Sequence, residues 1–385
     1  MIPYGKQDIS KQDIDAVLQV LQSDFLTQGP QVPAFEKAVT EFTGSQFGCA
    51  VNSATSALHI ACLALGLGER DIIWTTPITF VASSNCGLYC GAGIDFVDID
   101  PRTYNLCPDK LEQKLIQAEQ AGKLPKVLVA VHLCGQPCDM KRIHELSLQY
   151  GFKLIEDASH AIGGSYQDSK IGSCTYSDIT IFSFHPVKIV TTAEGGMAVT
   201  NDKELFDKMS LLRSHGITRD ESMMQEESHG GWYYEQIALG YNYRMTELQA
   251  ALGVSQMQRL GEFISARHKL AGRYNEQLKE LPLTLPFQLE NTYSGLHLYV
   301  IRLQLDLINK THKQVFEELR EKGIGVNLHY IPVHTQPYYK EMGFDWGDFP
   351  EAEKYYQEAI SIPMFHGMTI EQQDEVVDVL RNVLR

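Results

Sequence analysis

Short apolar runs alternate with longer amphipathic segments through the first half of the chain. The runs are rich in Val and Ile, which is typical of strands buried on both faces. We expect strands within residues 71–76, 94–97, 127–133, 152–157, 179–182 and 197–199. Apolar residues at helical spacing predict helices over residues 53–67, 79–90, 107–119 and 140–150. This alternation predicts an α/β fold with a mostly parallel sheet covered on both faces.

The pattern changes after residue 243. Residues 245–281 are almost all helix formers and are closed by Pro282, so they predict a long helical connection. Beyond it we expect a strand at 296–305, a helix at 312–322, a strand and turn at 325–333 and a helix at 370–384. We therefore expect a large domain over residues 1–244, including the N-terminal segment. A small α+β domain over residues 245–385 would include the connecting helix.

The charge balance argues against some classes of partner. The 385 residues carry 33 Lys and Arg against 48 Asp and Glu, a formal net charge of −15. An acidic chain is a poor binder of nucleic acid or of an anionic membrane, so a phosphorylated ligand needs local donors. The N-terminus does not read as a signal peptide, and no apolar stretch approaches the ~18 residues of a membrane span. We expect a cytoplasmic enzyme.

Eight cysteines are scattered through the chain, mostly in apolar runs. Cys134 and Cys138 in CGQPC have the spacing of half a metal site. No second Cys or His pair at comparable spacing completes it, so we expect reduced structural thiols and no metal.

Polar residues follow several of the expected strands or begin a helix. The segment NSATS, residues 52–56, precedes a helix and suits either a helix cap or a bound phosphate. Thr79 and Phe80 follow the strand DIIWTT, where the Phe ring can stack on a flat ligand or join the core. Glu156 and Asp157 end the strand FKLIE, as a solvated turn or as a carboxylate that binds a ligand. The carboxyl ends of parallel strands are where ligands gather.

The stretch FSFHPVKIVTTAEGGMAVT, residues 182–200, places Ser183 and Lys188 between two strand-like runs. The amine of a lysine at such a place can bind an aldehyde covalently. A phosphate site, an aromatic ring, a carboxylate and an amine together match the needs of pyridoxal 5′-phosphate (PLP). The four features occur along the chain at expected strand ends and helix starts, so the set predicts a PLP site.

Long motifs over nearly the whole chain carry a family resemblance. They are LTQGPQVPAFE (26–36), NSATSALH (52–59), TTPITFVASSN (75–85), EDASHAIGGSY (156–166), SFHPVKIVTTAEGG (183–196), RSHGITR (213–219), GYNYRMTELQAALG (240–253) and HYIPVHTQPYY (329–339). The chain resembles the sugar aminotransferases of the DegT/DnrJ/StrS family. That resemblance implies the aspartate-aminotransferase fold, PLP fold type I, with a seven-stranded sheet in the large domain.

The resemblance also implies roles for single residues. Lys188 matches the lysine that binds PLP covalently, and Asp157 matches the carboxylate that faces the pyridine nitrogen. His160, near O3′ of the ring, stands where many members have Gln. The remaining cofactor residues would be Ala54, Thr55 and Ser183 around the phosphate, Phe80 stacked on the ring, and Asn242 reaching the phosphate in the partner subunit of a homodimer.

Within the family, the likeness is strongest to members that aminate a UDP-linked 4-keto-6-deoxy sugar, UDP-4-keto-6-deoxy-L-AltNAc, in pseudaminic acid biosynthesis. L-Glutamate would be the amino donor in a ping-pong reaction, and Lys188 would also move the proton from the Cα atom of glutamate. Expected substrate-binding residues are Tyr4, Asp24, Phe25, Leu26, Thr27, Ser56, His329, Tyr330, Ile331, Pro332 and His334.

Other functions on this scaffold remain open. Amination of another UDP- or dTDP-linked 4-keto sugar is the nearest alternative, because a fold does not fix its substrate. Related sugar 3-dehydratases carry His in place of the lysine, so Lys188 argues against that branch. A non-catalytic binding or regulatory protein would not need Asp157, Lys188 and Phe80 together. An NAD enzyme is disfavoured because the only Gly-rich candidate, LGLG at 65–68, falls at a helix end.

Overall fold

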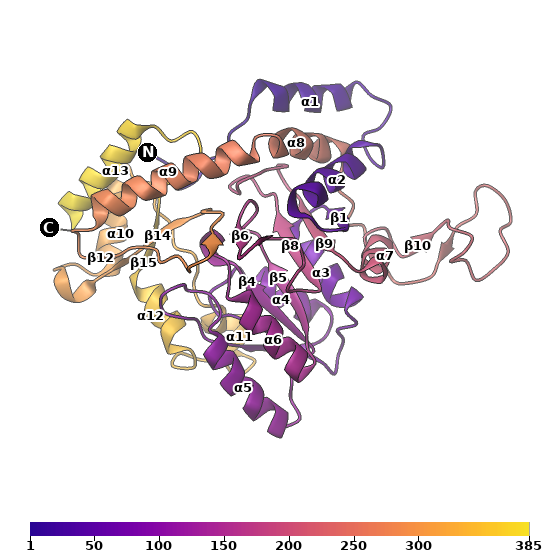
Figure 1. Cartoon of the computed structure of the whole chain (residues 1–385), viewed down its shortest axis with the longest axis horizontal. Helices are drawn as coiled ribbons and strands as arrows, with labels where there is room; N and C mark the ends of the chain where they lie inside the picture. The colour runs from indigo at the N-terminus through magenta and orange to yellow at the C-terminus, as the bar shows by residue number, and fades with distance from the viewer. Residues whose placement is uncertain (385) are drawn as a thin grey trace.

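A seven-stranded sheet forms the centre of the computed structural model, which describes residues 1–384 (Figure 1). Residue 385, the last of the expected second domain, lies outside these residues. The strand order is β1-β9-β8-β5-β4-β2-β3, and β9 alone runs antiparallel to its neighbours β1 and β8. The strands are β1 (Phe47–Val51), β2 (Ile72–Thr75), β3 (Gly93–Phe96), β4 (Val127–Val131), β5 (Lys153–Asp157), β8 (Ile179–Ser183) and β9 (Gly196–Thr200). The expected mostly parallel seven-stranded sheet is confirmed.

Both faces of the sheet are buried, which explains the unbroken apolar runs. In β4, Leu128 and Ala130 pack into one core, whereas Val127, Val129 and Val131 pack into the core on the other face. The helices α3 (Ala54–Ala64), α4 (Ala82–Tyr89) and α7 (Lys203–Leu212) contribute to the core that contains Val129. The core that contains Leu128 includes residues of α2 (Gln31–Thr43), α5 (Pro108–Gln120), α6 (Met140–Tyr150) and α8 (Glu247–Met257).

The C-terminal part forms a smaller unit with its own core. Its sheet has the order β12 (Leu283–Thr284), β14 (Tyr299–Leu303) and β15 (Ala359–Ile362). The helices of this part are α9 (Leu260–Leu278), α10 (His312–Glu321), α11 (Pro337–Lys340), α12 (Pro350–Glu358) and α13 (Ile370–Val383). Ile2 joins this core: its amide donates to the Gly323 carbonyl, and its carbonyl accepts from the Gly325 amide. The start of the chain therefore packs against the C-terminal unit.

Most expected elements are present, with two differences. Residues 245–281 form two helices, α8 and α9, rather than one, because the helical path breaks at residues 258–259. The strand expected within 325–333 is wrong. That segment makes only an isolated bridge between Asn327 and Ser361, followed by the short 3₁₀ turn η3 (Val333–Thr335).

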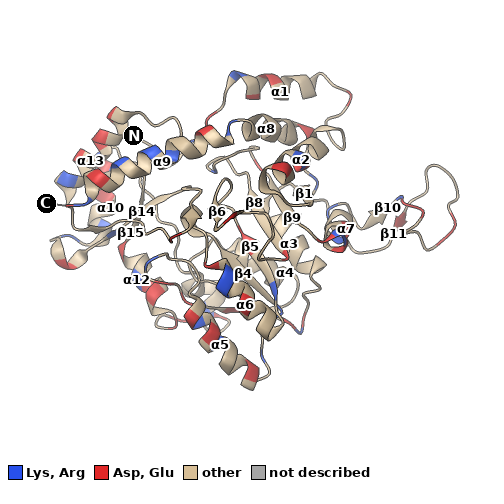
Figure 2. Cartoon of the chain, viewed as in Figure 1, with Lys and Arg blue, Asp and Glu red and all other residues tan. Residues whose placement is uncertain are grey.

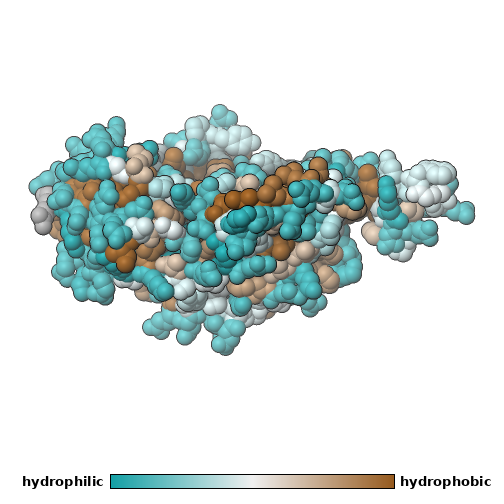
Figure 3. All heavy atoms as spheres, turned by 90° about the horizontal axis from the view of Figure 1, so that it is seen from above, coloured by the Kyte–Doolittle hydropathy of each residue, from teal (hydrophilic) through white to brown (hydrophobic). Residues whose placement is uncertain are grey.

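Minor elements complete the chain. A small sheet consists of β13 (Thr292–Tyr293), β6 (Ser165–Tyr166) and β7 (Ser169–Lys170), and short 3₁₀ turns are η1 (Leu133–Gly135) and η2 (Leu305–Leu307). Between β10 (Ile217–Thr218) and β11 (Glu235–Gln236), the chain extends away from the body as an arm (Figures 1 and 3). Charged residues of both signs are spread over the outer helices (Figure 2). Within residues 1–384, every helix is too short or too polar to span a membrane.

A buried carboxylate fastens α1 (Lys11–Leu21) to α8 and α9. The Asp13 side chain is 0% exposed, and its Oδ1 accepts from the Ser255 hydroxyl at 2.6 Å. Its Oδ2 accepts from Gln256 Nε2 at 2.7 Å and from the Arg259 guanidinium at 2.6 Å. Because a buried charge is costly unless it is paired, this network holds the N-terminal helix in place only while it is complete.

We expect the substitution Asp13→Asn to lower the free energy of unfolding by roughly 3 kcal/mol, because it leaves buried donors without their charged acceptor. Asp15→Asn is the matched control, since Asp15 pairs with Lys11 at 2.7 Å on the exposed side of the same helix. That change should cost at most about 0.5 kcal/mol. Urea unfolding of both variants measures the difference. Equal costs would show that Asp13 does not anchor the helix.

Candidate active site

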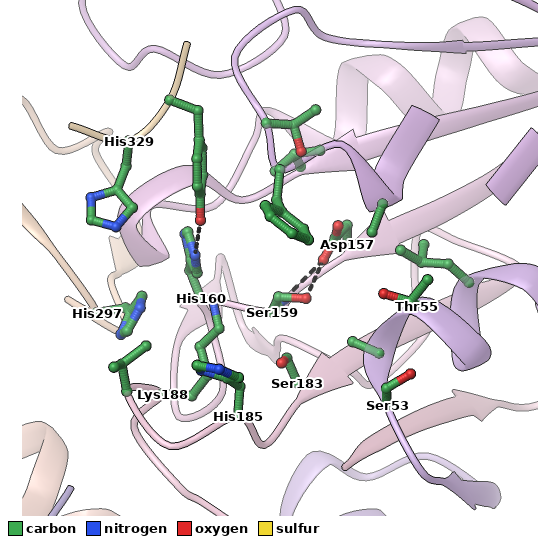
Figure 4. A pocket seen from close by; sticks show the side chains of 18 of the residues that line it. Ser53, Thr55, Asp157, Ser159, His160, Ser183, His185, Lys188, His297 and His329 are labelled. Carbon is green, nitrogen blue, oxygen red and sulfur yellow. Dashed lines mark hydrogen bonds between the residues drawn. The ribbon is translucent and has the colours of Figure 1, made fainter. Parts of the chain in front are cut away.

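A cavity of about 480 Å³ opens at the carboxyl ends of the central strands (Figure 4). The last residues of β4, β5 and β8, which are Val131, Asp157 and Ser183, all line it. Other residues that line it include Tyr4, Ser53, Ala54, Thr55, Phe80, Ser159, His160, His185, Lys188, Glu194, His297, His329 and Tyr330. The cavity therefore draws on the N-terminal segment, the large sheet and the C-terminal unit, as expected for a site at the strand ends.

The start of α3 forms one wall of the cavity. Ser53 caps the helix, and its hydroxyl accepts from the Ser56 amide at 3.1 Å. The first amides of a helix have no partner within it, and they carry partial positive charge that favours an anion. Gly196 lies directly beneath: a Cβ there would come within 2.4 Å of the Ala54 nitrogen. The close approach of the two backbones requires glycine at this position.

Asp157 is fixed by serine hydroxyls rather than by a cation. Its Oδ2 accepts from the Ser83 hydroxyl at 2.6 Å. Its Oδ1 accepts from the Ser159 hydroxyl at 2.6 Å and from the Ser159 amide at 3.1 Å. The carboxylate thus has a set orientation and no ion pair within residues 1–384, so its charge is available to a group in the cavity.

Lys188 lies in the loop between β8 and β9, as the sequence predicts. Its amide donates to the His185 carbonyl, and Thr192 and Phe184 close the loop by a backbone hydrogen bond of 2.9 Å. Burial lowers the pKa of the Lys188 amine to about 8, against the attraction of Asp157, which raises it. An amine with such a pKa exchanges protons readily near neutral pH, which suits a group that moves protons.

The hydrogen bonds of His160 determine its tautomer. Its Nδ1 accepts from the Cys134 amide at 3.2 Å, so in the neutral ring the proton sits on Nε2. Burial, and then the charges of Lys188 and His329, lower the pKa of His160 well below its usual range and keep the ring neutral. Nε2 lies 3.2 Å from the Tyr330 hydroxyl and donates to its oxygen. The hydroxyl proton of Tyr330 is then free to bind a ligand.

Aromatic rings surround the opposite end of the cavity from the start of α3 (Figure 4). The rings of Tyr4 and His329 lie 5.2 Å apart, and the rings of His160 and His297 lie 4.5 Å apart. Phe80 remains 58% exposed, so it is available to stack on a ligand and does not join the core. Sequence reasoning missed His297, which no local motif marks, and Ser83. Ser159 could have been found from the Asp-x-Ser spacing, which favours a local hydrogen bond.

Nine expected site residues do not line the cavity of this chain. The Ser56 hydroxyl donates to Asn52 Oδ1 at 2.7 Å beside the cap of α3, and His334 is fully buried against Glu353 at 3.1 Å. Asn242 is exposed. The other six are Asp24, Phe25, Leu26 and Thr27, which are exposed beside the start of α8, and Ile331 and Pro332, next to Tyr330.

The neutral histidines predict a loss of stability in acid. Burial, and then the charge of Lys188, lowers the pKa of His329 to about 4 in the folded protein, against about 6.5 for an unfolded histidine. Stability is therefore complete above pH 6.5 and falls as the pH drops to about 4, because only the unfolded chain takes up the proton. The full loss from this residue is about 3 kcal/mol.

Urea unfolding between pH 7 and pH 4 tests this expectation. The variant His329→Gln should lose stability less steeply than the parent protein as the pH falls. His229→Gln, at an exposed position in the arm, serves as the control and should follow the parent curve. If His329→Gln also followed the parent curve, the buried imidazole would not be the group that titrates.

Comparisons with known proteins agree with this geometry. The model of the DegT/DnrJ/EryC1/StrS aminotransferase family matches residues 7–381. The spore coat polysaccharide biosynthesis protein SpsC of Bacillus subtilis is 37% identical over 100% of this chain and 97% of that protein. The UDP-4-amino-4,6-dideoxy-N-acetyl-beta-L-altrosamine transaminase of Campylobacter jejuni is 36% identical over 100% of this chain and 98% of that protein. The solved structure of Helicobacter pylori PseC, an aminotransferase of pseudaminic acid biosynthesis, has a TM-score of 0.90 at 31% identity. The match covers 100% of this chain and 99% of that chain.

The enzymes of this family use PLP, and the cavity fits that group. The start of α3 suits its phosphate, and the anchored carboxylate of Asp157 suits a protonated ring nitrogen. The amine of Lys188 shares the cavity with both. With these matches over nearly its whole length, the chain belongs to the DegT/DnrJ/EryC1/StrS family and is a PLP-dependent sugar aminotransferase.

Proposed function

We propose that this enzyme transfers the amino group of L-glutamate to the C4 keto group of a UDP-linked 4-keto-6-deoxy amino sugar. The first candidate is UDP-4-keto-6-deoxy-L-AltNAc of pseudaminic acid biosynthesis. The convergence of Lys188, Asp157 and the start of α3 on one cavity carries the reaction type. The Campylobacter and Helicobacter relatives support the choice of sugar.

The residues divide the work as follows. PLP, when bound, supplies an electron-poor ring that accepts the electrons of the bond broken at the substrate carbon. Asp157 would keep the ring nitrogen protonated, since a fixed carboxylate stabilises the adjacent positive charge. Ala54, Thr55 and Ser183 would bind the phosphate. Phe80 would stack on the ring, and His160 would lie near its O3′.

Lys188 would have two roles, binding PLP covalently and moving a proton. Its lowered pKa leaves a useful fraction of the amine neutral near pH 8, so it can take the proton from Cα of glutamate. In the second half of the reaction the same group would return a proton to C4 of the sugar.

The sugar would enter at the aromatic end of the cavity. Tyr4, His329 and Tyr330 offer rings and neutral hydrogen-bonding groups there, which suit a sugar or a uracil. The expected contacts of Ile331, Pro332 and His334 are then indirect, because these residues support the loop that carries Tyr330. Such a pocket between two parts of a chain is a common place for a bulky second substrate.

A second candidate is a different nucleotide-linked 4-keto sugar. SpsC, which takes part in spore coat polysaccharide biosynthesis, is as similar to this chain as the Campylobacter transaminase is, at 37% against 36% identity. Identity therefore does not choose between these substrates. An amino-transfer assay from L-glutamate across UDP- and dTDP-linked 4-keto-6-deoxy sugars decides, with the aminated product identified by mass spectrometry. Turnover of dTDP-linked sugars alone would overturn the first candidate.

We also propose that the active unit is a cytoplasmic homodimer with shared sites. Asn242 is exposed and lies outside its own cavity, although its neighbour Tyr243 accepts from the Asn52 amide at 2.8 Å. No arginine is among the described residues that line the cavity. A diphosphate and two carboxylates then need donors from a second chain. The sugar site of the partner subunit would be approached by four further exposed residues, Asp24, Phe25, Leu26 and Thr27.

The substitution Lys188→Ala should reduce transamination by at least roughly 100-fold, because the group that moves the proton is lost. Borohydride treatment of the parent enzyme with PLP should attach the cofactor to the peptide that contains residue 188, and the variant should show no such attachment. Lys170→Ala, at an exposed lysine, is the control and should retain both properties. Attachment at the parent level in Lys188→Ala would identify another lysine as the anchor.

Mixing two inactive variants tests the shared site. In a heterodimer of Lys188→Ala with Asn242→Ala, one site would carry both lesions and the other none, if Asn242 acts in the partner's site. Statistical exchange of subunits should then restore about a quarter of all sites. Activity of the mixture, with exchange confirmed by differently tagged subunits, is the measurement. No recovery after confirmed exchange would place Asn242 in the site of its own chain.

A further inference from the structure

Three buried histidines line the cavity, and their ring nitrogens are not equally available to a ligand. His160, His297 and His329 are 5%, 4% and 7% exposed. Both nitrogens of His160 are used within the chain, since Nδ1 accepts from the Cys134 amide and Nε2 donates to the Tyr330 oxygen. A ring whose donor and acceptor are both engaged has no hydrogen bond left for a ligand.

The ring nitrogens of His329 are engaged in the same way. Its Nδ1 donates to the Ser361 hydroxyl at 2.8 Å, and its Nε2 accepts from Asn327 Nδ2 at 3.5 Å. The ring can still pack against a ligand, as it packs against the Tyr4 ring at 5.2 Å. His329 therefore contributes an aromatic surface to the cavity and not a free donor.

The ring of His297 differs, because it makes no hydrogen bond within residues 1–384. Its Nδ1 is fully enclosed and has no partner there, whereas its Nε2 remains accessible from the cavity that the ring lines. A buried polar atom without a partner destabilises a fold. Buried polar side chains are for that reason nearly always bonded, and an exception in a cavity wall points to a ligand.

The unequal surroundings of the two nitrogens favour one tautomer of His297. Burial, and then the neighbouring His160 and Lys188, hold the pKa of His297 well below its usual range, so the ring is neutral. With the proton on Nδ1, an N–H group would be enclosed without an acceptor. With the proton on Nε2, the N–H group can bond to water or to a ligand. His297 is therefore expected to present an N–H donor to the cavity.

The backbone on both sides of His297 is anchored, so the place of the ring is set before a ligand binds. The buried Arg267 guanidinium donates to the His297 carbonyl at 2.9 Å, and the Leu298 amide donates to the Cys134 carbonyl at 3.3 Å. Since the Cys134 amide bonds to His160, one residue fixes the two histidines relative to each other, with their rings 4.5 Å apart. A binding group held by its surroundings in this way is preorganised.

His297 also lies near the place of reaction. Figure 4 shows His160, His297 and Lys188 at the end of the cavity away from Ser53 and Thr55. Because the Lys188 amine must reach the reacting carbon of the substrate, that carbon and its neighbouring groups lie in the part of the cavity that His297 shares.

We propose that His297 is a sugar-binding residue of this enzyme, whose Nε2–H group donates a hydrogen bond to an oxygen next to the carbon that receives the amino group. The inference rests on the proposed entry of the sugar at the aromatic end of the cavity. It holds for any nucleotide-linked 4-keto sugar that enters there.

The chemistry of the donor favours the sugar over the carboxylate of glutamate. Carboxylates gain most from charged donors, and burial keeps the His297 ring neutral. A hydroxyl or carbonyl oxygen of a sugar is itself neutral, so a neutral N–H group suits it. Tyr4 and Tyr330, which line the same end of the cavity, are also neutral.

Measuring the two half-reactions separately tests the assignment. Loss of the visible absorbance of the PLP enzyme reports the reaction with L-glutamate, and its return with UDP-4-keto-6-deoxy-L-AltNAc, or with the sugar of the panel that the parent aminates, reports the second half. His297→Phe keeps a ring but has no donor. It should slow the sugar half about tenfold and leave the glutamate half within about twofold.

Two amide variants identify the nitrogen that acts. The amide nitrogen of His297→Gln can take the place of Nε2, so this variant should stay within about threefold of the parent in the sugar half. The amide nitrogen of His297→Asn lies nearer the place of Nδ1, so this variant should be as slow as His297→Phe. His229→Phe, at an exposed position in the arm, is the control and should match the parent.

Each other result of these assays overturns a distinct statement. Equal slowing of both halves by His297→Phe would assign the residue to the PLP site, and slowing of the glutamate half alone would assign it to the carboxylate. A sugar half as fast in His297→Phe as in the parent would overturn the inference alone. If no sugar restored the absorbance of the parent, the proposed function would fail first.

Two further measurements do not depend on the sugar. Histidine ¹H–¹⁵N NMR spectra of the PLP-loaded protein at pH 7, with His297→Phe to identify the signals, should show a neutral ring protonated at Nε2. A proton on Nδ1 would remove the donor and overturn the inference. In urea, His297→Phe should unfold at no lower concentration than the parent, because it removes a buried atom without a partner. A clear loss of stability would indicate a structural role instead.

Discussion

Three hydrogen bonds to the carboxylate of Asp157 are the contacts on which the rest of the site depends. Donors from Ser83 and Ser159 fix both oxygens, and within the described residues no cation pairs with them. A buried carboxylate in that state keeps its charge for whatever enters the cavity. Its position follows from the sheet, since β5 lies between β4 and β8, with Asp157 paired with Val131 at the end of β4 and with Ile181 near the end of β8. The order of the strands thus decides where this carboxylate stands in the cavity.

The cavity also needs the C-terminal unit, and the N-terminal segment links the two. Ile2 bonds to Gly323 and Gly325 in that unit, and the Tyr4 carbonyl accepts from the Met364 amide at 3.1 Å. Tyr4 therefore reaches the cavity from the side of His329 and not from the large sheet. The backbone of His297 is held in turn by the buried Arg267 guanidinium, which donates to its carbonyl at 2.9 Å. Packing far from the strands thus positions the aromatic end of the site.

Sequence reasoning predicted what local pattern determines. The apolar runs located six of the seven central strands, and the motif around Lys188 located the loop that carries it. The strand β1 was missed because its pairing with β9 joins residues that are far apart in the chain. The prediction of a strand within 325–333 failed because that segment forms a single bridge, between Asn327 and Ser361.

Part of the candidate site could also be predicted from the sequence, because some of its residues stand in local patterns. Lys188, Asp157 and Phe80 each follow or end a strand that the sequence predicts. Because parallel strands end at one edge of the sheet, the three residues are expected to lie together. Ser83 and His297 enter the site through tertiary contacts that no local spacing reveals. Asn242 and residues 24–27 lie on the surface of the single chain, outside its own cavity, where no local pattern shows what they contact.

The net negative charge of the molecule means that an anionic substrate must be bound by donors in direct contact with it. A protein with a net charge of −15 repels an anionic sugar nucleotide at long range, and salt screens that repulsion beyond about 10 Å. Binding must then come from donors in direct contact. The start of α3 provides such donors for one phosphate, but no arginine lines the cavity among the described residues. The lysine there is committed to PLP in the proposed reaction. The diphosphate of the proposed substrate therefore needs hydrogen-bond donors besides those at the start of α3. In the proposed homodimer, the second subunit would provide them.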